Sequence, residues 1–144
     1  MNKVDMVLIE KSARKMSLLS GRKTVAQYDI DLGFNPTGHK EQEGDGRTPE
    51  GFYKISGRNP KSKYFLSLKI SYPNEQDMQF AAKKGISSGG DIMIHGLPNA
   101  LSFLGIRKKL KKDWTQGCIA VQTNSEMKEI WNNVANGTMV EIRP

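Results

Sequence analysis

The chain has a single cysteine, Cys118, and two histidines among its 144 residues. One cysteine excludes an intramolecular disulfide, so cysteine usage says nothing about the redox compartment. It also excludes an ordinary zinc site, because neither a CxxC nor an HxxxH spacing is present to supply the ligands. We therefore expect no metal and no cofactor.

Long hydrophobic runs are absent as well. No stretch approaches the length of a membrane span. The segment Met1–Asp5 is not followed by the apolar run of a signal peptide, so either the protein is not exported by that route or the chain begins after a removed leader. No repeat, low-complexity tract or linker interrupts the sequence, which predicts a single domain over residues 1–144 that can bury a core without disulfides.

Charge is plentiful and mostly of one sign. The net charge is +7, and Arg107–Lys112 places five cations within six residues. Nucleic acid, anionic lipid or an acidic polymer would each explain such a run, and so would a solvated basic loop. Aromatic residues make up only 8% of the chain, and no aromatic-rich recognition motif accompanies the run. Nucleic-acid binding therefore lacks support.

Short strand patterns dominate the chain. They predict strands at Val4–Glu10, Lys15–Leu19, Thr24–Leu32, Gly51–Ile55, Tyr64–Ser71 and Thr138–Ile142. Between the third and fourth of these, residues 33–51 form a long turn-rich stretch, which is usually functional or disordered.

Two segments have helical patterns. One is Asn74–Lys84, which stops at Gly85. The other begins with a capping box at 123–126, followed by apolar residues at helical spacing, namely Met127, Ile130, Trp131 and Val134. Many short strands with about two short helices predict a mainly β fold, a sandwich or a barrel.

The lone cysteine lies directly after a glycine, Gly117, and His95 ends an apolar run 23 positions before it. Free cysteine is usually a small buried hydrophobe, which is the alternative interpretation. Two features favour a nucleophile with its base instead. Gly117 leaves backbone N–H groups unobstructed, as an oxyanion hole requires. His95 lies where a strand meets a loop, and functional side chains concentrate there.

Three segments resemble one known family. They are His95-Gly96, Thr115-Gln116-Gly117-Cys118, and residues 44–53 with their Thr-Pro-Glu-Gly turn. Together they are similar to the catalytic domain of the L,D-transpeptidases, the YkuD family of bacterial peptidoglycan enzymes. Asp-Trp-Thr-x-Gly-Cys-Ile-Ala-Val is typical of its subgroup related to YafK. Two features depart from the usual pattern, since Gln116 replaces a second histidine and the interval between His95 and Cys118 is longer and holds the basic run.

The resemblance implies a mechanism and a fold, an L,D-transpeptidase-like β-sandwich or barrel. Cys118 would attack the diaminopimelate–D-Ala bond of peptidoglycan stem peptides and form a thioester, with His95 as base and no cofactor. His95 would lower the pKa of the thiol and hold the thiolate. The N–H groups of Gly117 and Cys118 would stabilise the oxyanion, and a carbonyl near Gly96 would orient His95.

Substrate contacts are expected from four residues, Trp114, Thr115, Gln116 and Arg47. Arg47 and the Arg107–Lys112 run would meet the carboxylates of the stem peptide. Gln116 would either bond the substrate or brace its loop, and for Trp114 a core position is slightly favoured over a place in the pocket wall. His39 is expected on a surface loop. The family also implies a bacterial periplasm or cell-envelope location and, in the YafK-related subgroup, a wall-linked lipoprotein as a partner.

Other functions remain open on the sequence. The same site can act hydrolytically, as an L,D-carboxypeptidase, as an amidase that releases a wall-linked lipoprotein, or as a wall-degrading toxin delivered to another cell. A wall-binding or nucleic-acid-binding domain without catalysis would belong to a different class. Intact His95 and Cys118 argue against that class, because binding requires neither.

Overall fold

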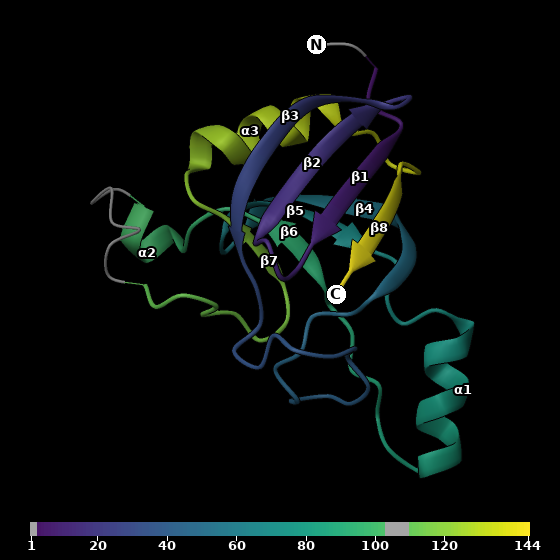
Figure 1. The fold of residues 1–144 in the computed structure, drawn as a ribbon. Helices are drawn as coiled ribbons and strands as arrows, with labels where there is room; N and C mark the ends of the chain where they lie inside the picture. Colours follow the sequence, from purple (N-terminus) through teal and green to yellow (C-terminus); the bar gives the residue numbers. More distant parts are fainter. Residues whose placement is uncertain (1–2, 103–109) are drawn as a thin grey trace.

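The computed structural model describes residues 3–102 and 110–144 of the chain. Within these residues eight strands close into a barrel in the order β1-β2-β3-β7-β6-β5-β4-β8. Figure 1 shows the barrel with α3 across one end and α1 pointing away from it. Residues 107–109 of the predicted basic run lie outside the described part of the chain. The predicted mainly β fold is confirmed, and the barrel is the form it takes.

The strands are β1 (Met6–Glu10), β2 (Lys15–Ser20), β3 (Lys23–Asp31), β4 (Gly51–Ser62), β5 (Phe65–Ile70), β6 (Met93–His95), β7 (Ile119–Val121) and β8 (Met139–Arg143). All six predicted strands are present. β4 continues well beyond the predicted end at Ile55, because its polar second half pairs with β5 across two register shifts. β7 was not predicted, since three residues are too few to give a strand pattern.

Alternation of side chains explains the barrel interior. In β1 every second residue is buried, as expected when one face of a strand packs on a core. The fully buried large side chains are Ile9, Met16, Leu18, Leu32, Ile55, Leu68, Ile70, Ile94, Ile119, Met127, Ile130 and Ile142. They come from seven strands, α3 and one loop position, so the core is a single cluster within the barrel.

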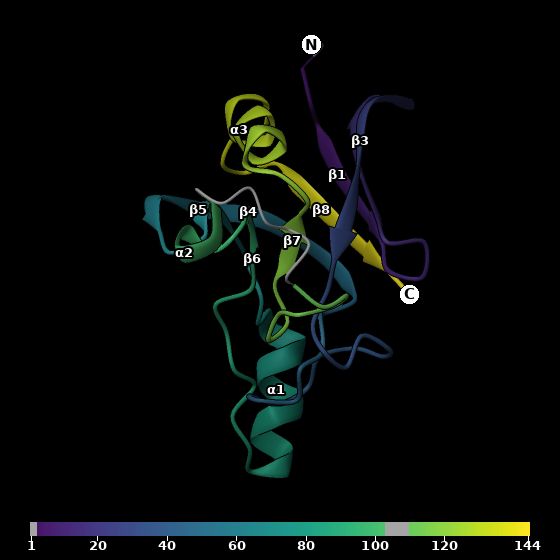
Figure 2. The ribbon, with the colours of Figure 1, turned by 90° about the vertical axis from the view of Figure 1, so that its left-hand side faces the viewer.

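The helices follow their predicted caps. α3 (Asn124–Asn133) begins after Thr123, whose side chain accepts the Glu126 N–H in a capping box, and it buries Met127 and Ile130 against the barrel. α1 (Glu75–Lys84) ends at Gly85, which adopts φ +64°. Figure 2 shows that α1 and α3 lie at opposite ends of the molecule. A third helix, α2 (Asn99–Ser102), has only four residues and was not predicted.

The pairing of β6 with β7 positions the site. These two short strands are parallel, with Ile94 opposite Ile119 and His95 opposite Ala120. Because side chains alternate along a strand, Ile94 and Ile119 enter the core together. The same alternation brings His95 and Cys118, the residue just before β7, to the opposite face.

Candidate active site

The Cys118 thiol is held by the backbone of the segment that leads into β6. Its Sγ donates to the Asp91 carbonyl oxygen at 3.2 Å and accepts the Met93 N–H at 3.4 Å. Burial raises the pKa of the Cys118 thiol, because a buried thiolate loses its solvation. The free protein therefore carries a neutral thiol at this position.

His95 lies beside it and is only 3% exposed. Its Nδ1 contacts the Gly96 carbonyl oxygen at 2.8 Å. Since a carbonyl oxygen only accepts, Nδ1 carries the proton and Nε2 keeps a lone pair. Burial lowers the pKa of His95 to about 4. The neutral imidazole is thus the resting form, and it can accept a proton at Nε2.

These two environments correct one sequence-based expectation. His95 was expected to lower the pKa of the Cys118 thiol and to hold a thiolate. In the structure burial acts on both groups, raising the pKa of the thiol and lowering that of the imidazole. A buried thiolate–imidazolium pair is costly when its charges are desolvated, so the resting pair is neutral.

Two cavities meet at this pair of residues. The larger, about 370 Å³, is lined by Cys118 and His95 together with residues that include Asp91, Lys61 and Lys63. The smaller, about 160 Å³, is lined by Tyr64, His95, Trp114, Thr115, Gln116 and Cys118. A molecule on either side of the thiol can therefore reach it.

Thr48, in the predicted Thr-Pro turn, holds the loop that carries the cysteine through hydrogen bonds. Thr48 Oγ1 donates to the Gly117 carbonyl oxygen at 2.8 Å and accepts the Gly33 N–H at 3.1 Å. Gly117 adopts φ +140°, and a Cβ there would lie 2.7 Å from the Arg47 carbonyl oxygen. Only glycine fits this position, so the Gly-Cys sequence has a structural reason beside any chemical one.

A glycine-to-alanine pair of variants tests that fit. We expect Gly117→Ala to lower the free energy of unfolding by about 2 to 4 kcal/mol, because it adds a backbone clash to an unfavourable φ. Gly137 is the control, since it adopts φ +90° and a Cβ added there would meet no atom within 4 Å. Gly137→Ala should cost about 1 kcal/mol. Thermal and urea unfolding measure both, and equal losses would contradict the proposed close packing of the cysteine loop.

The Thr115 side chain forms hydrogen bonds with the backbone of the cysteine loop. Its Oγ1 accepts the Gly117 N–H at 3.1 Å and donates to the Cys118 carbonyl oxygen at 2.7 Å. In this structure the Thr115 hydroxyl oxygen therefore accepts the same N–H that was expected to serve as an oxyanion donor. The role of the Cys118 N–H as an oxyanion donor stays a prediction.

The other residues expected to bind substrate separate into two groups. Trp114 and Gln116 line the smaller cavity, and the Trp114 ring lies with its centroid 5.6 Å from that of His95. Arg47 lines neither cavity beside the thiol. Its guanidinium is directed away, 4.0 Å from a Glu41 carboxylate oxygen, while its backbone packs on Gly117.

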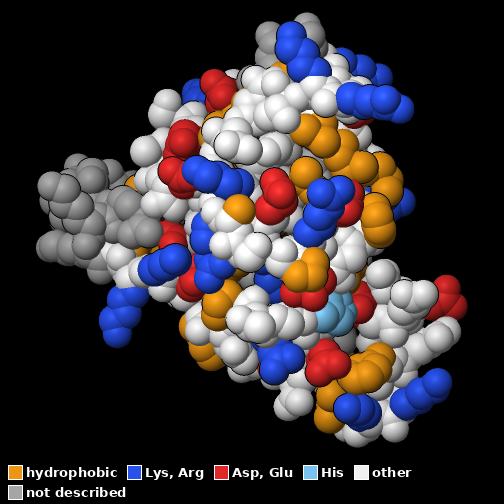
Figure 3. Space-filling view, in the orientation of Figure 1, with side chains coloured by type: hydrophobic (Ala, Val, Ile, Leu, Met, Phe, Trp, Pro, Cys, Tyr) orange, Lys and Arg blue, Asp and Glu red, His pale blue; other side chains and the backbone are white. Residues whose placement is uncertain are grey.

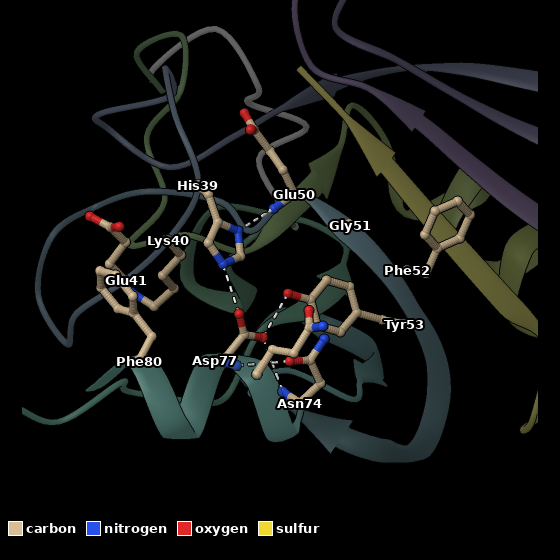
Figure 4. A pocket seen from close by; sticks show the side chains of 11 residues that line it. His39, Lys40, Glu41, Glu50, Gly51, Phe52, Tyr53, Asn74, Asp77 and Phe80 are labelled. Carbon is tan, nitrogen blue, oxygen red and sulfur yellow. Dashed lines mark hydrogen bonds and ion pairs between the residues drawn. The ribbon is translucent and has the colours of Figure 1, made fainter. Parts of the chain in front are cut away.

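His39 belongs to a different hollow of about 430 Å³, between residues 39–41, the start of β4 and α1. Figure 4 shows its ring between Glu50 and Asp77. Nδ1 accepts the Glu50 N–H and Nε2 donates to Asp77 Oδ1, each at 2.8 Å. Asp77 also accepts the Tyr53 hydroxyl at 2.8 Å. Both ring nitrogens are thus occupied, and His39 fastens α1 to the barrel.

Tyr64 was missed by the sequence reasoning. Its ring stacks on that of His95, with centroids 4.3 Å apart and an interplanar angle of 21°. Its carbonyl oxygen accepts the Gly96 N–H at 2.9 Å. Tyr64 lies in the turn between β4 and β5, and only the pairing of β5 with β6 brings that turn to the histidine. No local signal in the sequence predicts such a contact.

Three further properties concern the described chain as a whole. Within residues 3–102 and 110–144, no three His, Cys, Asp or Glu side chains are grouped as a metal site would require. No helix of the described chain is long and apolar enough to cross a membrane. On the described surface visible in Figure 3, basic and acidic side chains are interspersed rather than separated into fields.

Fold and site together define a mainly β barrel with a thiol and a neutral histidine at the junction of two cavities. Residues 5–142 match the L,D-transpeptidase catalytic domain, the YkuD family. The chain belongs to this family.

Individual relatives agree with that assignment. The chain is 34% identical to YafK of Escherichia coli (strain K12) over 91 residues. These residues cover 62% of this chain and 32% of YafK, whose own assignment as an L,D-transpeptidase is provisional. The crystal structure of a K307A mutant of Pgp2, a helical cell shape determining protein from Campylobacter jejuni, has a TM-score of 0.72 at 28% identity over 99% of this chain and 49% of that one. An L,D-transpeptidase from Xylanimonas cellulosilytica has a TM-score of 0.61 at 15% identity, over 99% of this chain and 61% of that one, and shares the fold. The chain thus spans about a third of YafK and half of Pgp2.

Proposed function

We propose that this domain is a peptidoglycan-modifying cysteine acyltransferase of the bacterial cell envelope. Its donor is a stem peptide, and the bond that it breaks is the diaminopimelate–D-Ala amide. The observation that carries the proposal is the position of Cys118 and His95, which line the same two cavities in a domain of the L,D-transpeptidase family.

The first half-reaction uses the neutral resting pair. Nε2 of His95 takes the proton of the Cys118 thiol as sulfur attacks the carbonyl carbon of diaminopimelate. The Cys118 N–H stabilises the tetrahedral oxyanion, a contribution of about 2.7 to 4 kcal/mol for one such donor. The imidazolium then returns its proton to the departing D-Ala nitrogen, and a thioester remains on Cys118.

In the second half-reaction an amine or water attacks the thioester, loses its proton to His95, and releases the Cys118 thiol. An amine acceptor gives a transpeptidase and water gives a carboxypeptidase or an amidase. Gln116 faces the smaller cavity and is the nearest difference from the family motif, so we place the choice of acceptor there. A wall-linked lipoprotein that is released would instead leave in the first half-reaction, as the amine that Cys118 displaces in place of D-Ala, and water would then hydrolyse the thioester.

The direct test uses purified muropeptides and mass spectrometry. Tetrapeptide stems that end in D-Ala should lose that residue, either with crosslinking to a second stem or with addition of water. Tripeptide stems, which lack the bond, are the control and should not act as donors. Unchanged tetrapeptides, incubated with a protein whose thiol still reacts with an alkylating reagent, would refute the proposal.

A further inference from the structure

The two cavities beside Cys118 differ in charge. The smaller one is lined by aromatic and uncharged side chains together with neutral His95. The larger one is lined by two lysines, Lys61 near the end of β4 and Lys63 in the turn after it. A substrate that reaches the thiol therefore finds positive charge on one side only.

Neither lysine is neutralised by a close partner. Both are exposed, and within the described part of the chain no ion pair or side-chain hydrogen bond involves either ammonium group. Two other lysines, Lys11 and Lys40, are by contrast paired with Glu50 and Asp45. Two unpaired cations at a cavity mouth attract an anion, because no close carboxylate of the protein neutralises their charge.

One carboxylate opposes them. Asp91 lines the same cavity. With His95 neutral, the lining of this cavity therefore carries two cations and one anion. The backbone carbonyl of Asp91 holds the Cys118 thiol at 3.2 Å, which fixes this residue at the thiol end of the cavity. Lys61 and Lys63 belong to the β4–β5 segment, which lines the same cavity.

We infer that Lys61 and Lys63 form a carboxylate-binding subsite that selects an acidic acyl donor. The inference rests on the proposed function for its donor. Diaminopimelate carries a second carboxylate on its side chain, and Cys118 and the two lysines line one cavity of about 370 Å³. Charge-assisted hydrogen bonds from the two ammonium groups hold that carboxylate while the scissile carbonyl lies at Cys118.

This subsite differs from the one expected on the sequence. Arg47 was expected to meet the stem-peptide carboxylates, but its guanidinium lies outside the cavity. Lys61 and Lys63 are an ordinary polar strand end in the sequence. They become a subsite only because β5 pairs with β6, which brings the β4–β5 turn beside the histidine.

Binding to a single pair of peptides tests the subsite without requiring turnover. The probe is L-Ala-γ-D-Glu-diaminopimelate-D-Ala with its side-chain carboxylate either free or converted to the carboxamide. Affinity is measured by calorimetry in a Cys118→Ala background at low salt. We expect the free acid to bind about tenfold more tightly, the size of a charge-assisted contact at a partly exposed site. Added salt should reduce that preference.

Substituting both lysines should remove the preference for the free-acid peptide and leave binding of the carboxamide peptide unchanged. In Lys61→Met/Lys63→Met the two peptides should bind within about twofold of each other, because the methylene packing remains while the charge is gone. Lys69→Met is the matched control, an exposed lysine of β5 that does not line the cavity, and it should keep the preference. Equal weakening of both peptides by the double substitution, an unchanged preference, or failure of both peptides to bind would each overturn the inference. Failure of the proposed function would appear separately, as tight acid-selective binding without cleavage by the wild-type protein.

Discussion

Replacing Cys118 with alanine should abolish D-Ala release, with a loss of at least about 10⁴-fold in kcat, as when the nucleophile of a catalytic set is removed. The fold should survive. The side chain makes two backbone contacts, to Asp91 and Met93, and losing them should cost less than about 1.5 kcal/mol of unfolding free energy. Release of D-Ala from tetrapeptide stems and thermal unfolding measure the two effects on one preparation.

Opposite results would restore the alternative interpretation of a small buried hydrophobe. A large loss of stability with turnover retained would mean that Cys118 is a packing residue. Cys118→Ser is the matched control, since serine keeps a donor and acceptor near the same place. It should match the wild type in stability and the alanine variant in its loss of activity.

Replacing His95 with glutamine should lower kcat by about 10² to 10⁴-fold, the usual contribution of a general base. The activity of the wild-type protein should also fall as the pH drops through about 4, which gives the acid limb of its pH–activity profile. The sign follows from the lowered pKa of His95, about 4, because only the neutral imidazole accepts the thiol proton and it is present above that pH. An unburied histidine would lose activity near pH 6.5 instead.

Tyr64 provides the control for that assignment. Its ring covers one face of His95, so Tyr64→Leu should admit water, raise the pKa of His95 and move the acid limb to higher pH. Tyr64→Phe keeps the stacked ring and should leave the limb in place. A limb that stays near pH 4 in Tyr64→Leu would show that burial by Tyr64 does not set the titration.

Local features of the sequence predicted local structure well. The capping box at Thr123 and the stop at Gly85 each depend on a few neighbouring residues, and both helices that they bound are present. Pairings between segments that are far apart in the sequence were harder to predict. β7 has three residues, and its parallel partner β6 is far from it in the chain, so nothing near Ile119 indicates that pairing.

The site divides in the same way. His95 and Cys118 were identified by a motif, and the parallel pairing of β6 and β7 explains why that motif brings them to one face of the sheet. Lys63 and Tyr64 come from a turn that reaches the site only through tertiary pairing. The neutral resting state could not be predicted either, because burial sets both pKa shifts, and burial depends on the whole barrel.

The central claim is that Cys118 becomes acylated by the stem peptide during turnover. The most direct measurement is acid quenching of the wild-type protein with saturating tetrapeptide stem, followed by proteolysis and mass mapping. We expect the peptide that contains Cys118 to carry the acyl group, with a mass increase equal to the tetrapeptide less free D-Ala, and hydroxylamine should remove it as it removes a thioester. An acyl group found on any other side chain, while D-Ala is released, would contradict the account.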